Sequence, residues 1–326
     1  SFTLFSVFQQ HVQRNKDKIA IRLNQHQLSF LELNTRVDRM YQNIVSHYGD
    51  ITEERLIGLC FDDPLHMIVA FLCVLKLNVN HISIDDKASP EAIYDILFET
   101  QVSVLLTTVT LKQSLPTDDQ KIICVDAFDD ISHSKANTIS IEARHQNSKD
   151  IGCDLVLIEH YVDSKKHFQS IAYPHSAILH QIAYFAEVYK FNTDDKLLHI
   201  SLDTSILHYQ NIFHFIYCGC ELVTFPGQPD DIDDLLNALS HNGITILYCT
   251  SSCFLALMHL LMNNPTHVMK LESLRLICFT GDPMTMGTIS KVQQWFSQST
   301  LTAKVVYASS YPATGFGMSV YELFDI

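Results

Sequence analysis

The chain alternates short, uninterrupted apolar segments with amphipathic helical segments along most of its length. A strand that is apolar on both faces has to be covered on both, which parallel sheets with helices on each side achieve. The pattern therefore predicts an α/β fold with two mainly parallel, helix-flanked sheets. Helices are predicted around residues 5–12 and over 30–44, 67–75 and 90–98. The predicted strands span 19–23, 56–60, 81–84, 102–106, 122–125, 155–158, 197–200, 222–225, 244–248, 274–279 and 304–307.

Residues 129–150 interrupt this alternation with polar and charged residues that follow no period. Such a stretch is typical of a linker or a variable loop. We therefore expect a first α/β lobe over residues 1–128 and a second one over 151–326.

Charge and hydropathy exclude several classes of partner. The chain has 22 Lys and Arg against 36 Asp and Glu, a formal charge of −14, which repels nucleic acid and anionic lipid. Its longest apolar run, Cys253 to Met262, is far shorter than the roughly 20 residues that span a bilayer. The nine cysteines show no spacing of a disulfide framework. We expect a cytoplasmic protein without nucleic-acid or membrane partners and, since it begins at Ser1, a piece of a longer chain.

Glycine is scarce in this sequence. Ten glycines in 326 residues are less than half of the usual share of about 7%. Loops that wrap phosphate groups depend on glycine, because only glycine takes positive φ without strain. The shortage argues against a working phosphate loop.

Several segments together form an ordered and evenly spaced set of motifs. The set comprises Leu28–Met40, Leu75–Asp85 with Pro90 after it, Asp154–Val156, Pro174–Ala177, Leu202–Ser205, Gly219 and Leu274–Asp282. In this order and spacing they resemble the adenylation domains of nonribosomal peptide synthetases, which belong to the adenylate-forming superfamily of acyl-CoA synthetases and luciferases. One difference is that Asn78 stands where the family has glycine.

The resemblance implies the large N-terminal core of an adenylate-forming enzyme. Active relatives use ATP and magnesium to activate a carboxylate as an acyl-adenylate. They work beside neighbouring synthetase domains and pass the acyl group to a carrier protein. The C-terminal lid and its lysine have no counterpart before Ile326, so we expect a truncated core.

The phosphate loop of the family aligns with residues 161–170, where every family glycine is missing. Asp163 brings a negative charge to this stretch, and Gln169 replaces the family lysine. A carboxylate near a polyphosphate repels it, and bulky side chains disfavour the required backbone. We interpret the stretch as a vestigial phosphate loop formed by Tyr161, Val162, Asp163, Ser164, Lys165, Lys166 and Gln169.

The second nucleotide motif of the family is also altered. Ala313 stands where relatives carry the glutamate that holds magnesium, and a methyl group cannot bind a hard cation. We therefore expect no metal and no bound cofactor. The vestigial nucleotide and metal positions are Gly281, Asp282, Ala313 and Thr314.

The acyl pocket of the family maps onto a further group of residues. Asp203 matches the aspartate that pairs with the α-ammonium group of an amino-acid substrate. It is either retained for this recognition or survives as a cap at the end of a strand while the pocket has filled. The vestigial pocket comprises Asp203, Thr204, Leu207, Cys278, Thr280 and Ala308.

The sequence thus predicts a catalytically inactive pseudo-adenylation domain, with no catalytic residue of its own. Its expected role is that of a structural or docking element within a synthetase-like assembly. One alternative is an atypical but active amino-acid- or acyl-adenylating ligase. The other is a small-molecule binding module that works without ATP.

Overall fold

The computed structural model describes most of the chain. The described residues are 3–48, 56–117, 120–128, 155–162, 168–200, 206–225, 227, 231–280, 284–310 and 318–324. The predicted linker at 129–150 lies outside them. Within the described residues, no helix combines the length and the apolar character needed to cross a membrane.

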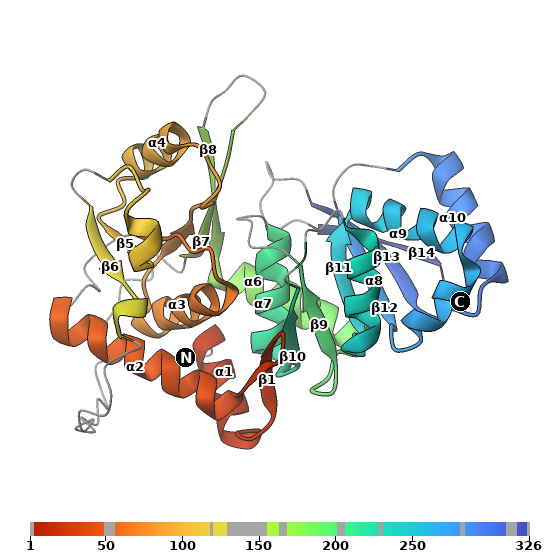
Figure 1. Cartoon of the computed structure of the whole chain (residues 1–326), viewed down its shortest axis with the longest axis horizontal. Coiled ribbons are helices and arrows are strands. Elements are labelled where there is room, and N and C mark those ends of the chain that lie inside the picture. The colour runs from red at the N-terminus through yellow and green to blue at the C-terminus, as the bar shows by residue number, and fades with distance from the viewer. Residues whose placement is uncertain are drawn as a thin grey trace. The chain divides into compact units, whose positions relative to one another are not determined.

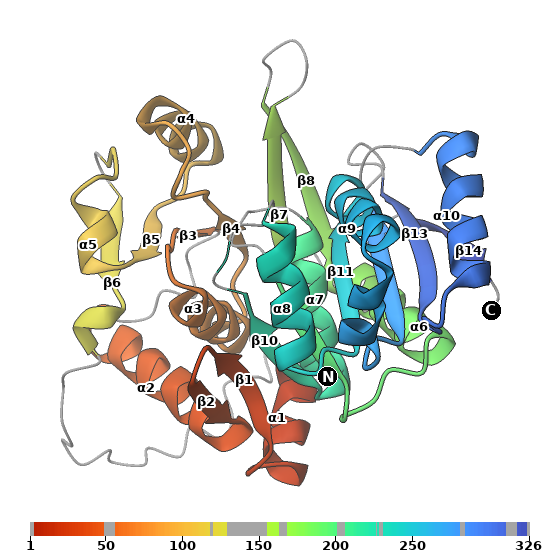
Figure 2. The ribbon, with the colours of Figure 1, turned by 45° about the vertical axis from the view of Figure 1, so that its right-hand side comes forward.

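The larger sheet of the described chain has eight strands in the order β14-β13-β12-β11-β9-β10-β1-β2 (Figures 1 and 2). Neighbours from β13 through β1 run parallel, and the antiparallel strands β14 and β2 form its two ends. Its members are β1 (Ile19–Leu23), β2 (His26–Ser29), β9 (Lys196–His199), β10 (Glu221–Thr224), β11 (Ile246–Thr250), β12 (Leu276–Thr280), β13 (Lys304–Ser310) and β14 (Met318–Phe324).

The smaller sheet of the described chain has six strands in the order β6-β5-β3-β4-β7-β8. All neighbours run parallel except β8, which pairs antiparallel with β7 at one edge. Its members are β3 (Ile57–Leu59), β4 (His81–Ser83), β5 (Val104–Thr107), β6 (Lys121–Cys124), β7 (Leu155–Val162) and β8 (Phe168–Pro174).

Helices connect the parallel strands and cover the sheets. Two short 3₁₀ helices, η1 (Asp126–Phe128) and η2 (Pro265–Leu271), complete the described elements. The α-helices are α1 (Leu4–Arg14), α2 (Phe30–Tyr48), α3 (Pro64–Leu77), α4 (Pro90–Thr100), α5 (Val109–Lys112), α6 (His175–Val188), α7 (Ile206–Cys218), α8 (Ile232–His241), α9 (Ser251–Asn263) and α10 (Met286–Gln298).

The predicted fold class of two helix-flanked, mainly parallel sheets is confirmed. All eleven predicted strands are present, with ends that differ by a few residues. The sequence reasoning missed β2, β8 and β14. Each is an antiparallel strand at a sheet edge with polar residues among the apolar ones, so none shows the uninterrupted apolar run of a central strand.

The two compact units do not follow the lobes expected from the sequence, 1–128 and 151–326. One unit comprises Ser1–Leu33 with Leu179–Ile326, and the other comprises Asn34–Ile178. The reason is strand pairing. β1 finds its parallel partner in β10, with Ile21 opposite Leu222, while β7 joins the smaller sheet beside β4.

The left-handed end of α3 explains one departure from the family pattern. Asp63 caps the start of α3 by accepting a hydrogen bond from the His66 amide, and Pro64 fits the first turn. Asn78 ends the helix at φ 57° and ψ 45°. Among non-glycine residues asparagine tolerates this region best. Asn78 therefore keeps the backbone turn at the position where relatives use glycine.

In the smaller sheet, α3 and α4 cover opposite faces (Figure 1). The His81 ring meets Phe71 of α3 edge-on, with 5.0 Å between ring centroids. Its neighbour Ile82 belongs to the cluster of buried side chains that contains Ile93 and Leu97 of α4. Alternate residues of a strand point to opposite faces, so the two helices lie on opposite sides.

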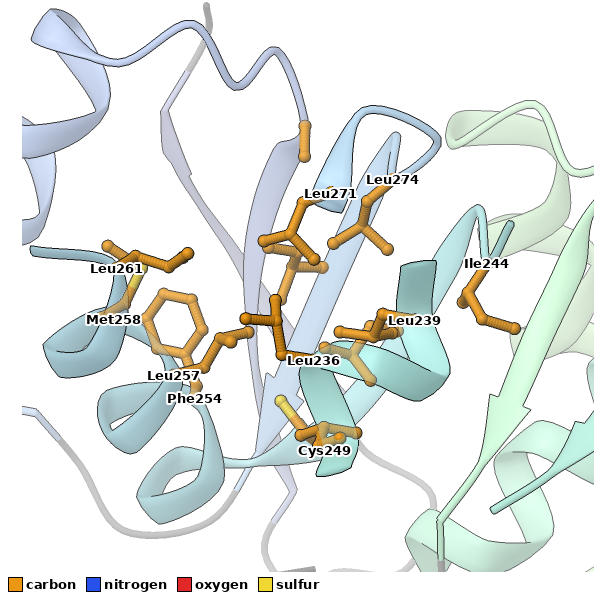
Figure 3. Close-up of a cluster of buried hydrophobic side chains, with 14 of the residues drawn as sticks. Leu236, Leu239, Ile244, Cys249, Phe254, Leu257, Met258, Leu261, Leu271 and Leu274 are labelled. Carbon is orange, nitrogen blue, oxygen red and sulfur yellow. The ribbon is translucent and has the colours of Figure 1, made fainter. Parts of the chain in front are cut away.

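In the larger sheet, α8 and α9 bury their apolar sides together against β11, β12 and β13. Figure 3 shows Leu236 and Leu239 of α8 facing Phe254 and Leu257 of α9. The Phe254 ring stacks on Phe279 of β12, with 4.2 Å between centroids and 2° between planes. This cluster forms a core on one side of the strands.

A buried imidazole on α7 packs against β11. His214 of α7 is 3% exposed, and its Nδ1 lies 2.7 Å from the Gln210 carbonyl, to which it donates. Its Nε2 lies 3.5 Å from the Tyr248 hydroxyl of β11, and its ring stacks on Phe191. Burial lowers the pKa of His214 to about 4. The side chain is therefore neutral in the folded protein at pH 7.

An ion pair joins the amino-terminal ends of three parallel strands. Asp195 is 3% exposed and accepts from Arg275 Nε at 2.8 Å and Nη2 at 2.5 Å, and from Thr245 Oγ1 at 2.8 Å. Arg275 also donates to the carbonyls of Tyr189 and Lys190. Asp195 precedes β9, Thr245 precedes β11 and Arg275 precedes β12, so one buried carboxylate holds the three strand entries together.

We predict that Gly219→Ala destabilises the protein far more than Gly243→Ala. Both glycines have positive φ, 68° and 59°, so alanine at either costs about 1 kcal/mol in backbone strain. At Gly219 a Cβ would also overlap the ring of His11, which bonds the Tyr217 carbonyl, whereas nothing lies within 4 Å at Gly243. This overlap adds roughly 1–3 kcal/mol. Chemical denaturation measures the difference, and equal losses for both variants would contradict the packing described.

A second prediction concerns stability in acid. The pKa of His214 falls to about 4 on folding from a value near 6.5 in the unfolded chain. The unfolded state therefore binds the proton first, and stability is lost as pH falls from about 6.5 towards 4. This residue should account for roughly 2 kcal/mol of the loss between pH 7 and pH 5.

The measurement is the free energy of unfolding of wild type and His214→Phe across this pH range. The variant should lose less stability than wild type as the pH falls. Tyr248→Phe is the matched control, because it removes the neighbouring hydroxyl and keeps the imidazole, so its pH dependence should follow wild type. Parallel curves for His214→Phe and wild type would contradict the prediction.

Candidate functional site

The carboxyl ends of the parallel strands are the places where loops of α/β folds bind ligands. The stretch predicted to be a vestigial phosphate loop begins within the carboxyl end of β7, in the smaller sheet, and ends within β8. Most predicted acyl-pocket positions follow or occupy the carboxyl ends of strands in the larger sheet. Each group is described within its own unit.

The stretch predicted to be a vestigial phosphate loop lies partly in the paired strands of the β7–β8 hairpin (Figure 2). Tyr161 pairs with Gln169 and Val162 with Phe168 in the antiparallel ladder of β7 and β8. Half of the ten positions 161–170 therefore lie in paired strands, namely 161–162 and 168–170. Asp163, Ser164, Lys165 and Lys166 lie outside the described residues, so their predicted role remains a prediction.

The ladder constrains what this backbone can bind. Main-chain N–H groups of paired antiparallel strands point to the neighbouring strand or away from it, in the plane of the sheet. A phosphate nest needs consecutive N–H groups that converge on one point, a geometry that glycine favours. Residues 161–162 and 168–170 have strand geometry instead, so these positions do not form such a nest.

Three predicted pocket positions come together on two neighbouring strands of the larger sheet. Cys278 and Thr280 lie on β12, and Ala308 lies on β13. Phe279 pairs with Tyr307, so Thr280, which ends β12, and Ala308 are the next residues along these two strands. Leu207 lies in the first turn of α7, which packs against β9 and β11. The remaining predicted positions, Asp203, Thr204, Gly281, Asp282, Ala313 and Thr314, fall outside the described residues.

Cys278 has an apolar environment. Its side chain is 2% exposed, and burial raises the pKa of its thiol far above the usual value. A thiol that remains protonated is a poor nucleophile and a poor metal ligand. Cys278 can therefore shape a pocket wall but is not suited to covalent chemistry.

The hydroxyl groups beside Thr280 are engaged in local structure. The Ser251 hydroxyl donates to the Thr280 carbonyl at 3.2 Å. Thr250, opposite Thr280 on β11, caps α9 by accepting from the Cys253 amide at 3.2 Å. These contacts hold the end of β12 against the start of α9.

Two buried polar residues near the carboxyl end of β9 were not singled out by the sequence reasoning. His199 ends β9 and is 2% exposed, and Asn211 of α7 is 3% exposed. Asn211 donates through Nδ2 to the Leu198 carbonyl at 3.4 Å. Its Oδ1 finds no hydrogen-bond partner within the described part of the chain. The only signal in the sequence is a polar residue inside each of two apolar runs, which is hard to tell from drift in composition.

Metal ligands do not gather anywhere in the described part. No group of three or more His, Cys, Asp or Glu side chains there is arranged to hold a metal ion. The chemistry available at the described strand ends consists of hydroxyl, amide, imidazole and thiol groups. Such groups can position a polar ligand through hydrogen bonds.

Comparison with known proteins agrees with this architecture. The family model described as "AMP-binding enzyme" matches residues 8–166 and 170–308, so the match is interrupted at 167–169. Tyrocidine synthase 3 of Brevibacillus parabrevis is 25% identical over 291 residues, which cover 88% of this chain and 4% of that protein. Zwittermicin A synthase ZmaJ of Bacillus cereus is 20% identical over 305 residues, 90% of this chain and 55% of that protein. The chain thus spans only part of the length of these relatives.

Solved structures show the same fold. The N-terminal subdomain of NpsA from Klebsiella oxytoca, in complex with 3-hydroxybenzoyl-AMSN, has a TM-score of 0.79 at 14% identity over 98% of this chain and 75% of that one. The nonribosomal peptide synthetase FmoA3 has a TM-score of 0.78 at 16% identity over 95% of this chain and 31% of that one. The arrangement of sheets and the family match together identify the chain as a member of the AMP-binding enzyme family, similar to the adenylation domains of nonribosomal peptide synthetases.

Proposed function

We propose that this chain is a pseudo-adenylation domain that keeps the fold of its family without its ATP chemistry. Its role is that of a structural or docking element in an assembly of the nonribosomal peptide synthetase type. The observation that carries the proposal is the stretch 161–170, which contains no glycine and whose positions 161–162 and 168–170 lie in the paired strands β7 and β8.

Phosphate binding is the step that the hairpin disfavours. Charge on the leaving pyrophosphate has to be stabilised by donors that are already in place. The ladder from Leu155–Pro174 to Val162–Phe168 leaves only residues 163–167 between its last paired positions. These residues are Asp-Ser-Lys-Lys-His, with no glycine among them. Two lysines attract an anion as point charges, but they do not replace a set of converging N–H groups.

Magnesium binding is disfavoured by the chemistry of Ala313. A methyl side chain offers no oxygen to a hard cation, so the residue cannot act as the carboxylate that the family supplies. The side chains at these aligned positions therefore fit neither the triphosphate nor its metal, and we derive no reaction step through them.

A docking role agrees with the size of the relatives, which are longer than this chain. Tyrocidine synthase 3 is many times longer than this chain, which spans 4% of it. NpsA–ThdA of Klebsiella oxytoca is an artificially fused adenylation–PCP di-domain, and the chain resembles it with a TM-score of 0.79. Neighbouring synthetase domains or a carrier protein are accordingly the partners that we propose.

We predict that ATP with magnesium does not raise the melting temperature of this protein. A ligand that binds only the native state raises the free energy of unfolding by RT ln(1 + [L]/Kd). This is about 1.4 kcal/mol when the ligand concentration is ten times Kd. Thermal unfolding at millimolar ATP should therefore superimpose on the curve without nucleotide. A catalytically active adenylation domain, measured in parallel, is the positive control. A saturable, magnesium-dependent rise would contradict the proposal and favour an active ligase, as would pyrophosphate exchange by a longer natural form.

A repair experiment tests the physical cause. Replacing residues 161–170 with a glycine-rich loop of the family type and changing Ala313→Glu should produce magnesium-dependent ATP binding, because donors and a metal ligand return together. The loop replacement alone and Ala313→Glu alone are the matched controls and should bind more weakly. If the doubly repaired protein folds but does not respond to ATP, the loss of binding has another cause than the residues named here.

A further inference from the structure

Helix α4 presents an exposed aromatic pair to solvent. Tyr94 and Phe98 lie one turn apart and are 42% and 68% exposed. Their rings are stacked, with 6.2 Å between centroids and 12° between planes. An adjoining side of the helix, through Ile93 and Leu97, is buried in the core of the smaller sheet. The exposed rings therefore contribute nothing to that core.

A row of carboxylates runs beside the two rings. Glu91, Asp95 and Glu99 are all exposed and follow each other at intervals of four residues, which places them on one side of the helix. They form no ion pair within the described part of the chain, and α4 itself has no basic residue. Like charges at this spacing destabilise an isolated helix slightly.

A surface hollow continues from the second ring. It has a volume of about 450 Å³ and is lined by Phe98 and Glu99 of α4, Gln101 after the helix and Gln120 before β6, among others. An apolar side chain from a partner can enter this hollow beside the Phe98 ring. We name Tyr94, Phe98, the three carboxylates and this hollow the α4 face.

We propose that the α4 face docks a basic helical segment of a partner protein, in which lysine or arginine side chains flank apolar ones. The apolar side chains cover Tyr94 and Phe98 and fill the hollow, and the basic ones pair with Glu91, Asp95 and Glu99. This inference rests on the proposed docking role and names the surface and the chemistry of its partner. Helix-on-surface recognition of this kind uses apolar anchors surrounded by complementary charge.

Charge selects this occupant over the others. Nucleic acid and anionic membranes carry the same sign as the carboxylate row and are repelled. A second copy of the chain would bring the same three carboxylates to a symmetric interface, and the formal charge of −14 adds repulsion between copies. A basic segment with apolar side chains neutralises the repulsion among the three carboxylates and also covers the two exposed rings.

The test uses the whole chain and a labelled helical peptide of about 14 residues, long enough to lie along the exposed turns of α4. The probe carries a row of leucines flanked by lysines. Two matched probes replace the lysines with glutamates or the leucines with serines. Fluorescence anisotropy measures the dissociation constant of each probe for wild type and variants.

We expect only the lysine–leucine probe to bind, and Phe98→Ser and the double change Asp95→Lys with Glu99→Lys each to weaken it at least tenfold. Tyr184→Ser and Glu272→Lys are the matched controls, because they change an exposed ring and an exposed carboxylate away from α4, and they should bind as wild type does. All changed residues are exposed, and unfolding curves verify that each variant is folded.

The inference is overturned if the α4 variants bind as tightly as wild type, or if the lysine–serine probe binds equally well. It is also overturned if light scattering shows a dimer that Phe98→Ser dissociates, since a second copy would then be the occupant. Each of these results can occur while ATP leaves the melting temperature unchanged. Failure of the α4 inference is therefore distinguishable from failure of the proposed function.

Discussion

The ion pair between the buried Asp195 carboxylate and Arg275 connects the strands at the centre of the larger sheet. A carboxylate that is 3% exposed needs several donors, and it receives them from Arg275, Thr245 and the Asn192 amide. Thr245 precedes β11, which neighbours β9, and Arg275 precedes β12, which neighbours β11. The contact therefore aligns the entries of three adjacent strands. Removing one partner of such a pair leaves an uncompensated charge, which costs more than the pair contributes. The alignment of these strand entries therefore depends on this contact, which lies at the amino-terminal ends of the strands.

Much of this fold could be predicted because central parallel strands carry a strong signal. Ile57–Leu59 and Val104–Thr107 are buried on both faces, so their sequences are almost continuously apolar. The edge strands gave no such signal, since strands with one covered face admit polar residues, as His26 and Gln27 of β2 do. The division into units could not be predicted either. It depends on which strands pair, and the pairing of β1 with β10 leaves no trace in the local pattern of either segment.

The sequence supplied candidate positions for a site, whereas the contacts around them are given only by the structure. The structure places the candidate positions Cys278, Thr280 and Ala308 on the adjacent parallel strands β12 and β13. The alignment of motifs did not predict that Tyr161 and Gln169 pair across a hairpin, because the local sequence of these segments does not reveal which strands pair. It also passed over Asn211, whose buried amide is visible only once α7 is placed on β9. The α4 face was hidden for the same reason, because exposure of an aromatic residue follows from packing.

The pairing of Ile21 with Leu222 has a consequence for biosynthesis. β1 leaves the ribosome long before its parallel partner exists, because 201 residues separate the two positions. At a synthesis rate of about 5–20 residues per second, this interval lasts roughly 10–40 s. During that time the apolar segment Ile19–Leu23 has only β2 to pair with, and its other edge is open to other chains. Nascent chains of this protein thus pass through a period in which one edge of the β1–β2 hairpin is without its native partner.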